Sequence, residues 1–292
     1  MITIKAYYIK QADKPNVIKQ TLNIIEIKNN ELIIQPIKEN TKQKNITKLA
    51  TKITKKCTKK NVSNIVLSKS LQNNKALKKA IIENKLNIFD GRWIFNFMAY
   101  ETIDYILQKT NRKKETTEVT ILTSNITYQA IETVKMLVKE YKRVNIVTNN
   151  ISKFKYLETK IYNEYGVMIT VTNNKRKSLA KSEIILNFDF SSEMLNQYNI
   201  NDEAIIINIC KDILIKKKRF HGLCVNDFEV SSTRTDDYFE LTKIKEFYLR
   251  DLLEAKFYRS DSFLSIRQDI VRGNFVIKEL YGVNGRIFKF TQ

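Results

Sequence analysis

The stretch Thr-Ser-Asn-Ile-Thr-Tyr at residues 123–128 carries the side chains best placed for chemistry in this chain. It follows a β-branched run at 119–122 and precedes a segment with apolar residues at three- and four-residue steps, and a second β-branched run follows at 144–147. This order predicts a βαβ crossover in a parallel sheet, with the first turn beside the ligand site. Hydroxyl and amide groups at a helix N-terminus can donate hydrogen bonds to an anion, which the helix dipole also favours.

The same loop lacks the glycines of a dinucleotide-binding fingerprint. Glycine would be needed at the first, third and sixth positions, which here are Thr123, Asn125 and Tyr128. The branched Thr123 and the bulky Tyr128 would hinder the close approach of a pyrophosphate to the backbone. We therefore expect a degenerate nucleotide loop.

Two further segments carry a resemblance to a known family: RVNIVTNNISKFKYLETKIYNEYG at 143–166 and SEIILN at 182–187. From about residue 119 to residue 188 the chain resembles the NAD(P)-binding Rossmann domain of the shikimate dehydrogenase and glutamyl-tRNA reductase type. The resemblance implies that residues after the second strand select the 2′-phosphate of NADP. It implies a cofactor site built from two loops: Thr123, Ser124, Asn125, Asn149, Asn150 and Lys153.

The chain departs from that family at three places. The glycine loop is lost, Asn150 stands where the family has arginine, and the family's catalytic lysine and aspartate have no match in a corresponding context ahead of this domain. The resemblance covers about a quarter of the chain and supports a fold more than an activity.

A second candidate site is Asp90, Arg92 and Trp93, which join a predicted strand to a predicted helix. Asp90 and Arg92 could bind a polar ligand and Trp93 could stack on a ring. The alternative, which we favour, is that Asp90 caps the helix while Trp93 packs into the core. His221 is the only histidine and could be a general acid or base, but no nucleophile lies at a recognisable spacing. We assign no catalytic residue and no metal site.

The net charge of +20 raises the question of nucleic acid. Positive charge attracts polyanions, but lysine heavily outnumbers arginine and is spread along the whole chain. Only residues 112–114 and 216–219 form basic clusters. We favour a solvated lysine-rich surface, and nucleic acid remains a partner suggested by charge alone.

The three cysteines have no close pair, which indicates a reducing cytoplasm, and Cys210 is expected to be a small buried residue. The sequence shows no signal-peptide pattern and no apolar run near ~18 residues, so we expect a cytoplasmic protein without a membrane span.

The predicted fold class is α/β: a doubly wound, mostly parallel Rossmann-like sheet, with small β appendages at both termini and a C-terminal helix. Hairpin turns are expected at Asn29-Asn30 and Asn284-Gly285, and one helix is expected over 238–257. We further expect the two appendages to pair with each other. The predicted domains are a β appendage at 1–44, a first α/β segment at 45–115, the Rossmann-like domain at 116–230, and the helix and hairpin at 231–292.

These observations favour a non-catalytic binding or scaffold module with a degenerate nucleotide loop, serving a protein partner or a small nucleotide. The alternative is a divergent NAD(P)-dependent oxidoreductase of the shikimate dehydrogenase type, and a nucleic-acid-binding protein is a further alternative.

Overall fold

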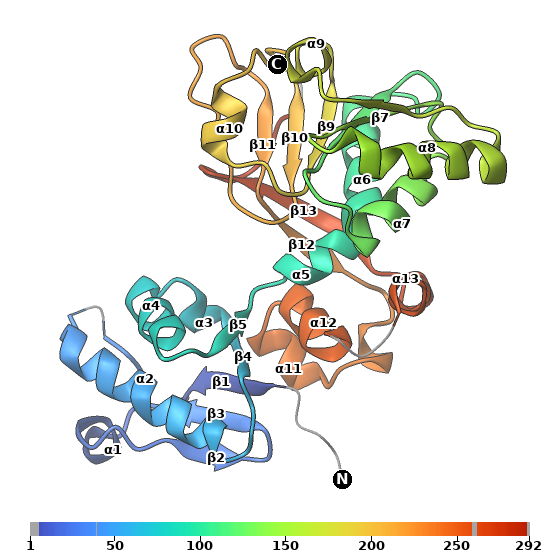
Figure 1. The fold of residues 1–292 in the computed structure, drawn as a ribbon. Helices are drawn as coiled ribbons and strands as arrows, with labels where there is room; N and C mark the ends of the chain where they lie inside the picture. Colours follow the sequence, from blue (N-terminus) through green and yellow to red (C-terminus); the bar gives the residue numbers. More distant parts are fainter. Residues whose placement is uncertain (1–5, 39, 259–261, 291–292) are drawn as a thin grey trace. The chain divides into compact units, whose positions relative to one another are not determined.

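The chain folds into two α/β units, which confirms the predicted class. The computed structural model describes residues 6–38, 40–258 and 262–290 (Figure 1). The first unit comprises residues 1–91 and 234–260, and the second comprises 92–233 and 261–292. The chain thus leaves the first unit and returns to it, a division that differs from the four consecutive segments expected from the sequence. Among the described residues no helix is long and apolar enough to cross a membrane.

The first unit is built on a five-stranded sheet in the order β2-β3-β1-β4-β5. Its strands are β1 (Tyr7–Gln11), β2 (Glu26–Lys28), β3 (Glu31–Ile34), β4 (Asn64–Leu67) and β5 (Asn87–Phe89). All neighbours are parallel except β2, which pairs antiparallel with β3 through the predicted turn, where Asn29 has φ of 54°. The N-terminal strands expected as an appendage therefore lie inside this sheet, because β1 pairs with both β3 and β4.

Helices cover both faces of this sheet. Four helices come from the N-terminal part: α1 (Val17–Thr21), α2 (Gln43–Thr58), α3 (Lys69–Gln72) and α4 (Lys75–Glu83). The apolar stripe of α2 and the buried side of α4 share one core with Tyr7 and Ile9 of β1. On the other face lie 3-10 helix η2 (Thr235–Asp237), α11 (Leu241–Glu246) and α12 (Leu249–Phe257), and the buried Leu252 and Ala255 of α12 pack with Val66 and Phe89.

The predicted single helix over 238–257 is interrupted at Phe247. That residue has φ of −119° and ψ of 156°, an extended conformation, and its side chain is fully buried. Burial of the ring in the core beside Tyr8 thus overrides the helical periodicity of the segment.

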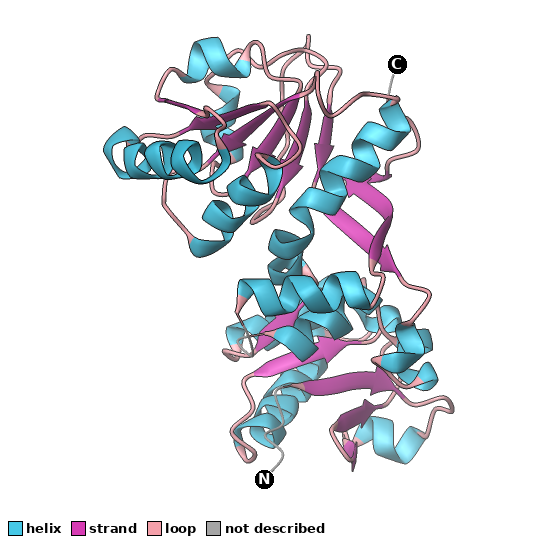
Figure 2. Cartoon of the chain, turned by 90° about the vertical axis from the view of Figure 1, so that its right-hand side faces the viewer, coloured by secondary structure: helices cyan, strands magenta, loops and turns pink. Residues whose placement is uncertain are grey.

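The second unit contains a six-stranded parallel sheet in the order β11-β10-β9-β6-β7-β8 (Figure 2). Its strands are β6 (Glu118–Leu122), β7 (Arg143–Val147), β8 (Thr170–Thr172), β9 (Ile184–Asn187), β10 (Ile205–Asn208) and β11 (Leu223–Val225). Counted from β6 along the chain, this is the order 3-2-1-4-5-6 of dinucleotide-binding Rossmann sheets. The predicted crossover is confirmed, because β6 and β7 are parallel and α7 (Tyr128–Leu137) connects them.

The second unit has further helices before its first strand and between later strands. They are α5 (Arg92–Phe95), η1 (Asn96–Met98), α6 (Ala99–Thr110), α8 (Ile151–Tyr165), α9 (Lys175–Leu179), α10 (Ser192–Asn196) and α13 (Phe263–Arg272). Helix α8 ends at Gly166, which adopts the left-handed conformation that glycine favours. Leu179 of α9 and Leu195 of α10 share a core with Leu122 and Ile185 of the sheet.

A small antiparallel sheet completes the second unit. It consists of β12 (Asp227–Ser231), β13 (Val276–Gly282) and β14 (Gly285–Arg286). The hairpin expected at Asn284-Gly285 is present, but its turn residues are Val283 and Asn284, because Gly285 already pairs with Gly282. The expectation that the two terminal β segments pair with each other is wrong. Each pairs within its own unit: β1 with β3 and β4, and β13 with β12 and β14.

Candidate functional site

The strand order of the second sheet reverses between β6 and β9, and this is where a Rossmann protein holds its ligand. Because β6 and β9 are parallel neighbours, the loops that leave their carboxyl ends, 123–127 and 188–191, lie side by side. The loop after β7, residues 148–150, borders them on the other side. The two loops that carry the residues implied by the family resemblance therefore lie next to each other.

An internal carboxylate occupies the backbone donors of this loop. The amide of Ser124 donates to both carboxylate oxygens of Asp189, each at 2.8 Å, and the Asn125 amide also donates to this carboxylate. Partial removal from water raises the pKa of Asp189 above its usual range, and these hydrogen bonds reduce the rise without cancelling it. The loop before a Rossmann helix thus already carries an anion, supplied by the chain itself.

Side chains from the loops after β6 and β7 hold the 123–127 loop in this shape. The buried Thr123 hydroxyl donates to the Asn125 carbonyl at 2.7 Å, and the Asn150 amide group donates to the Ser124 carbonyl at 2.6 Å. Helix α8 begins after Asn150, and the Asn150 side chain makes no capping hydrogen bond. Thr127 is the residue that caps α7, since its hydroxyl accepts from the Ala130 amide at 3.1 Å.

The two remaining positions implied for NADP selectivity lie at the surface. Asn149 is exposed at the end of β7, and its side-chain oxygen accepts from the Lys175 ammonium group. Lys153 is exposed on the first turn of α8. The structure thus brings four of the implied residues into one hydrogen-bonded group: Thr123, Ser124, Asn125 and Asn150. Asn149 instead forms a hydrogen bond with Lys175, the first residue of α9.

Three buried asparagines, which the sequence analysis missed, lie beside this group. Asn187, Asn208 and Asn226 end or follow β9, β10 and β11, and each is at most 3% exposed. The Asn187 amide donates to the Asn208 side chain at 3.1 Å, and the Asn208 amide donates to the Asn226 side chain at 2.8 Å. A repeated signal was present in the sequence, since IILN, IIIN and LCVN all place asparagine after an apolar strand.

This asparagine ladder, Asn187-Asn208-Asn226, fixes the neighbouring loops. Asn187 both donates to the Phe190 carbonyl and accepts from the Phe190 amide, at 2.9 and 3.0 Å. Asn226 makes the same reciprocal pair with Ile213, at 3.0 and 2.9 Å. Asp189 lies between Asn187 and Phe190, so the ladder positions the residue that occupies the nucleotide loop.

The second candidate site divides between the two units. Asp90 is exposed and belongs to the first unit, whose first segment ends at Gly91, a turn residue with φ of 83°. Arg92 belongs to the second unit, where its guanidinium donates to the Asn226 carbonyl at 2.7 Å and pairs with Asp212 at 2.5 Å. Trp93 is half-buried and packs against Phe97 with ring centroids 4.6 Å apart.

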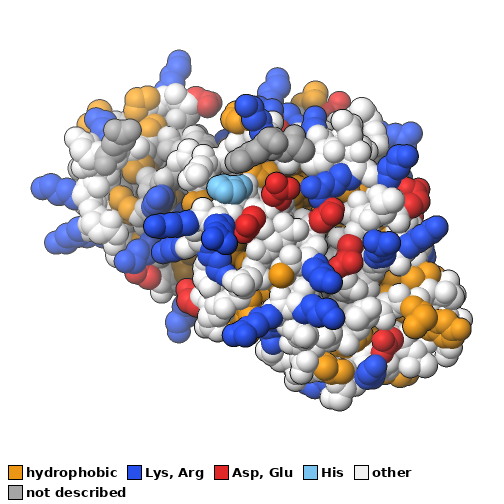
Figure 3. All heavy atoms as spheres, turned by 90° about the horizontal axis from the view of Figure 1, so that it is seen from above, with side chains coloured by type: hydrophobic (Ala, Val, Ile, Leu, Met, Phe, Trp, Pro, Cys, Tyr) orange, Lys and Arg blue, Asp and Glu red, His pale blue; other side chains and the backbone are white. Residues whose placement is uncertain are grey.

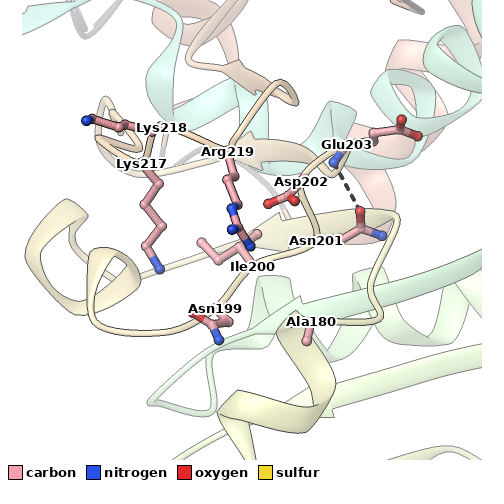
Figure 4. A pocket seen from close by; sticks show the side chains of 9 residues that line it. All are labelled: Ala180, Asn199, Ile200, Asn201, Asp202, Glu203, Lys217, Lys218 and Arg219. Atoms are coloured by element: carbon pink, nitrogen blue, oxygen red, sulfur yellow. Dashed lines mark hydrogen bonds between the residues drawn. The ribbon is translucent and has the colours of Figure 1, made fainter.

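A polar hollow of about 610 Å³ lies at the opposite edge of the sheet (Figure 4). It is lined by Ala180, residues 199–203 and residues 217–219, which precede β9, β10 and β11. His221 is exposed in the same connection before β11, and its amide donates to the Asp202 carbonyl at 2.7 Å. The single histidine is therefore at the amino edge of the strands, away from the switch point.

Some side chains of the basic clusters make contacts inside the chain, and those of the 112–114 cluster include ion pairs. Arg112 pairs with Glu183 at 3.1 Å, Lys114 contacts Asp104 and Glu140 at 2.8 and 2.6 Å, and Lys217 donates to the Tyr198 carbonyl. On the face drawn in Figure 3, basic and acidic side chains are interspersed. On that face, the positive charge is therefore not gathered into one binding surface.

The sulfur and carboxylate groups suggest no further chemistry. No group of three or more His, Cys, Asp and Glu residues that could hold a metal ion occurs within the described part of the chain. Burial raises the pKa of the Cys57 and Cys224 thiols to about 11. The expectation for Cys210 is wrong, because that residue is exposed.

Comparisons with known proteins show only distant likeness. No family model and no curated protein matches the sequence. Similar solved structures include ornithine carbamoyltransferase from Pyrococcus furiosus (11% identity, 70% of this chain and 71% of that one, TM-score 0.28). L-tryptophan dehydrogenase from Nostoc punctiforme is also similar (8% identity, 92% of this chain and 80% of that one, TM-score 0.34). So is shikimate 5-dehydrogenase from Listeria monocytogenes in complex with shikimate and NAD (11% identity, 71% of this chain and 79% of that one, TM-score 0.27). Similarity at this level identifies no ligand and no reaction.

Proposed function

We propose that this chain is a non-catalytic binding or scaffold protein of Rossmann-like fold, whose nucleotide loop is closed by its own carboxylate. The observation that carries the proposal is the pair of 2.8 Å contacts between the Ser124 amide and the two oxygens of Asp189. An amide at this position is the donor that a Rossmann protein offers to a pyrophosphate. Here that donor is already in use.

Electrostatics opposes a dinucleotide at the same place. A pyrophosphate beside the Asp189 carboxylate would be repelled by roughly 1 kcal/mol per unit charge at 4 Å in water and by about 4 kcal/mol at an effective dielectric constant of 20. Displacing Asp189 would also cost its two amide hydrogen bonds. Thr123 and Tyr128, at two positions where glycine would be needed, hinder the approach further.

The available acid and base groups support the same conclusion. His221 lies in the connection before β11, at the other edge of the sheet, and Arg92 is engaged by carbonyls and by Asp212. A scaffold needs none of these groups to react. We propose a protein partner for the module, with surfaces other than the nucleotide loop providing the contact.

A divergent NAD(P)-dependent oxidoreductase of the shikimate dehydrogenase type is the second candidate. The strand order 3-2-1-4-5-6 of the second sheet favours it, because that order is found in dinucleotide-binding proteins. In that case Asp189 would have to leave the loop when the cofactor binds, and Asn149 and Lys153 would lie near its adenosine end.

A thermal-shift titration with NAD, NADP and inorganic pyrophosphate separates the two candidates. We expect no rise in melting temperature for the wild-type protein at ~1 mM NAD or NADP, because a ligand stabilises only a native state that it binds. In Asp189→Ala, pyrophosphate should raise the melting temperature, whereas the control Asp202→Ala at the opposite edge should behave like wild type. A clear rise for wild-type protein with either dinucleotide would favour the oxidoreductase.

A further inference from the structure

The segment that contains α1 and leads into the edge strand β2 carries several exposed apolar side chains. They lie within eleven consecutive residues: Val17 (76% exposed), Ile18 (70%), Leu22 (56%), Ile24 (39%) and Ile27 (49%). Helix α1 has no buried residue, and β2 is the last strand at this edge of the sheet (Figure 1). Apolar side chains gathered at one place on a surface mark an interaction site more often than scattered ones do.

The backbone of β2 is ready to accept another strand. Lys28 and Glu31 pair across a two-residue turn, so they form a hydrogen-bonded pair, and the next pair, Ile27 with Leu32, is a non-hydrogen-bonded one. The N–H and C=O groups of Ile27 therefore point away from β3, toward the open edge. An unpaired row of this kind is a template for a strand from another chain.

The sequence of β2 fits a second copy of itself. An antiparallel pair of β2 strands centred on Ile27 would place the two Ile27 residues opposite each other, where they exchange two backbone hydrogen bonds. Glu26 of each copy would then lie opposite Lys28 of the other. Opposite charges in directly facing positions stabilise an antiparallel pair, and like charges destabilise it.

The side chains support the same pairing. Directly paired residues lie on one face of a sheet, so Ile27 is on the face of Leu32, which is fully buried in the core. A second copy would cover Ile27 and extend that core across the edge. Glu26 already pairs with Lys19 at 2.6 Å, but both side chains are about two-fifths exposed, and such a pair contributes at most ~1 kcal/mol.

We propose that α1 and the open edge of β2 form a homodimer interface, in which two copies join their first-unit sheets antiparallel about a two-fold axis at Ile27. Such an interface is isologous, because the same surface of each copy contacts its equivalent. The inference is independent of whether the second unit binds a nucleotide.

Sedimentation equilibrium of the full chain tests the interface. We expect the wild-type protein to be a dimer, and we expect Glu26→Lys and Lys28→Glu each to raise the dimer dissociation constant by about tenfold or more, because they place like charges opposite each other. The double variant should recover the wild-type constant, since the charges again match. Lys44→Glu, an equal change of charge on α2, is the control and should leave the constant unchanged.

A proline variant tests the backbone contact separately. Ile27→Pro removes the outward N–H group but no hydrogen bond within the hairpin, so it should yield a monomer with the circular dichroism spectrum of the wild type. The proposal is overturned if the wild-type chain is a monomer at concentrations on the order of 100 μM. It is also overturned if a dimer persists in all of these variants, or if the single charge variants weaken it and the double variant does not restore it.

Discussion

The two units of this chain close the carboxyl ends of their sheets by different means. In the second unit one side chain covers these strand ends, since the Asp189 carboxylate accepts hydrogen bonds from the Ser124 amide in the loop after β6. In the first unit a whole segment does so: the Lys69 ammonium, just after β4, donates to the Ile244 and Lys245 carbonyls, both at 3.1 Å and about 175 positions away in sequence. Gln72 donates in the same region to the buried Asp251 at 2.8 Å.

This difference between a side chain and a whole segment determines at which sheet the carboxyl ends of the strands can be made accessible. The segment in the first unit cannot leave without exposing its core, because α12 carries Leu252 and Ala255 into the same cluster as Val66 and Phe89. The Asp189 carboxylate is held by backbone amides at the surface, and its removal exposes no apolar core. A single substitution of Asp189 can therefore free the backbone amides at the carboxyl ends of the second sheet. No single substitution removes the segment that covers the carboxyl ends of the first sheet.

The largest predicted effect comes from loosening the segment in the first unit. Leu252→Ala removes a fully buried side chain and should lower the free energy of unfolding by about 2–5 kcal/mol, which urea denaturation measures. Leu241→Ala, on the exposed side of α11, should change it by less than ~0.5 kcal/mol. Equal losses in the two variants would contradict the view that α12 closes this edge through its core contacts.

The next effect concerns the asparagine ladder that supports Asp189. Asn208→Leu removes the bonds to Asn187 and Asn226 within a buried site, and should cost about 1–3 kcal/mol of stability. The exposed Asn199→Leu is the control and should be nearly neutral. If Asn208→Leu melts at the wild-type temperature, the ladder does not fix the loops at this edge.

A smaller effect with a pH signature is expected at Lys114. Burial alone would lower the pKa of this ammonium, but its hydrogen bonds to Asp104, Glu140 and Tyr100 outweigh burial and raise it. The same contact with Lys114 lowers the pKa of Glu140, so that carboxylate contributes stability above its ordinary value of 4.5 and loses it as the pH falls through the lowered value.

Lys114→Met should therefore lower the melting temperature at pH 7, with a loss of about 1–2 kcal/mol for these partly exposed pairs. The difference from wild type should shrink toward pH 3, as Glu140 becomes protonated. The neighbouring Lys113→Met, which changes an exposed lysine, serves as the control. A difference that is constant from pH 7 to pH 3 would show that Glu140 does not account for it.

Local patterns in the sequence predicted much of the fold. The β-branched runs at 119–122 and 144–147, expected as the two strands of the crossover, lie within β6 (Glu118–Leu122) and β7 (Arg143–Val147), because apolar patterning reports burial directly. The central position of β1 and the return of residues 234–260 to the first sheet depend on contacts between distant segments. No local pattern encodes such contacts, and the expected pairing of the two ends failed for that reason.

The candidate site was predicted in part. Strand ends and helix starts located Thr123, Ser124, Asn125 and Asn150, which the structure brings together. Asp189 was missed although it lies two residues after the end of β9, because its partner is a backbone amide 65 positions away. A pattern of side chains cannot reveal that a backbone donor is already in use.

The measurement that most directly tests the self-occupied loop is the NMR signal of the Ser124 amide. We predict that this resonance moves as the pH is lowered and Asp189 takes up its proton, with a midpoint above the ordinary value of 3.8, and that the movement is absent in Asp189→Ala. We also predict that NADP at neutral pH leaves it in place. The account would be contradicted if the Ser124 amide resonance did not move during the acid titration. It would also be contradicted if that resonance shifted with added NADP until saturation.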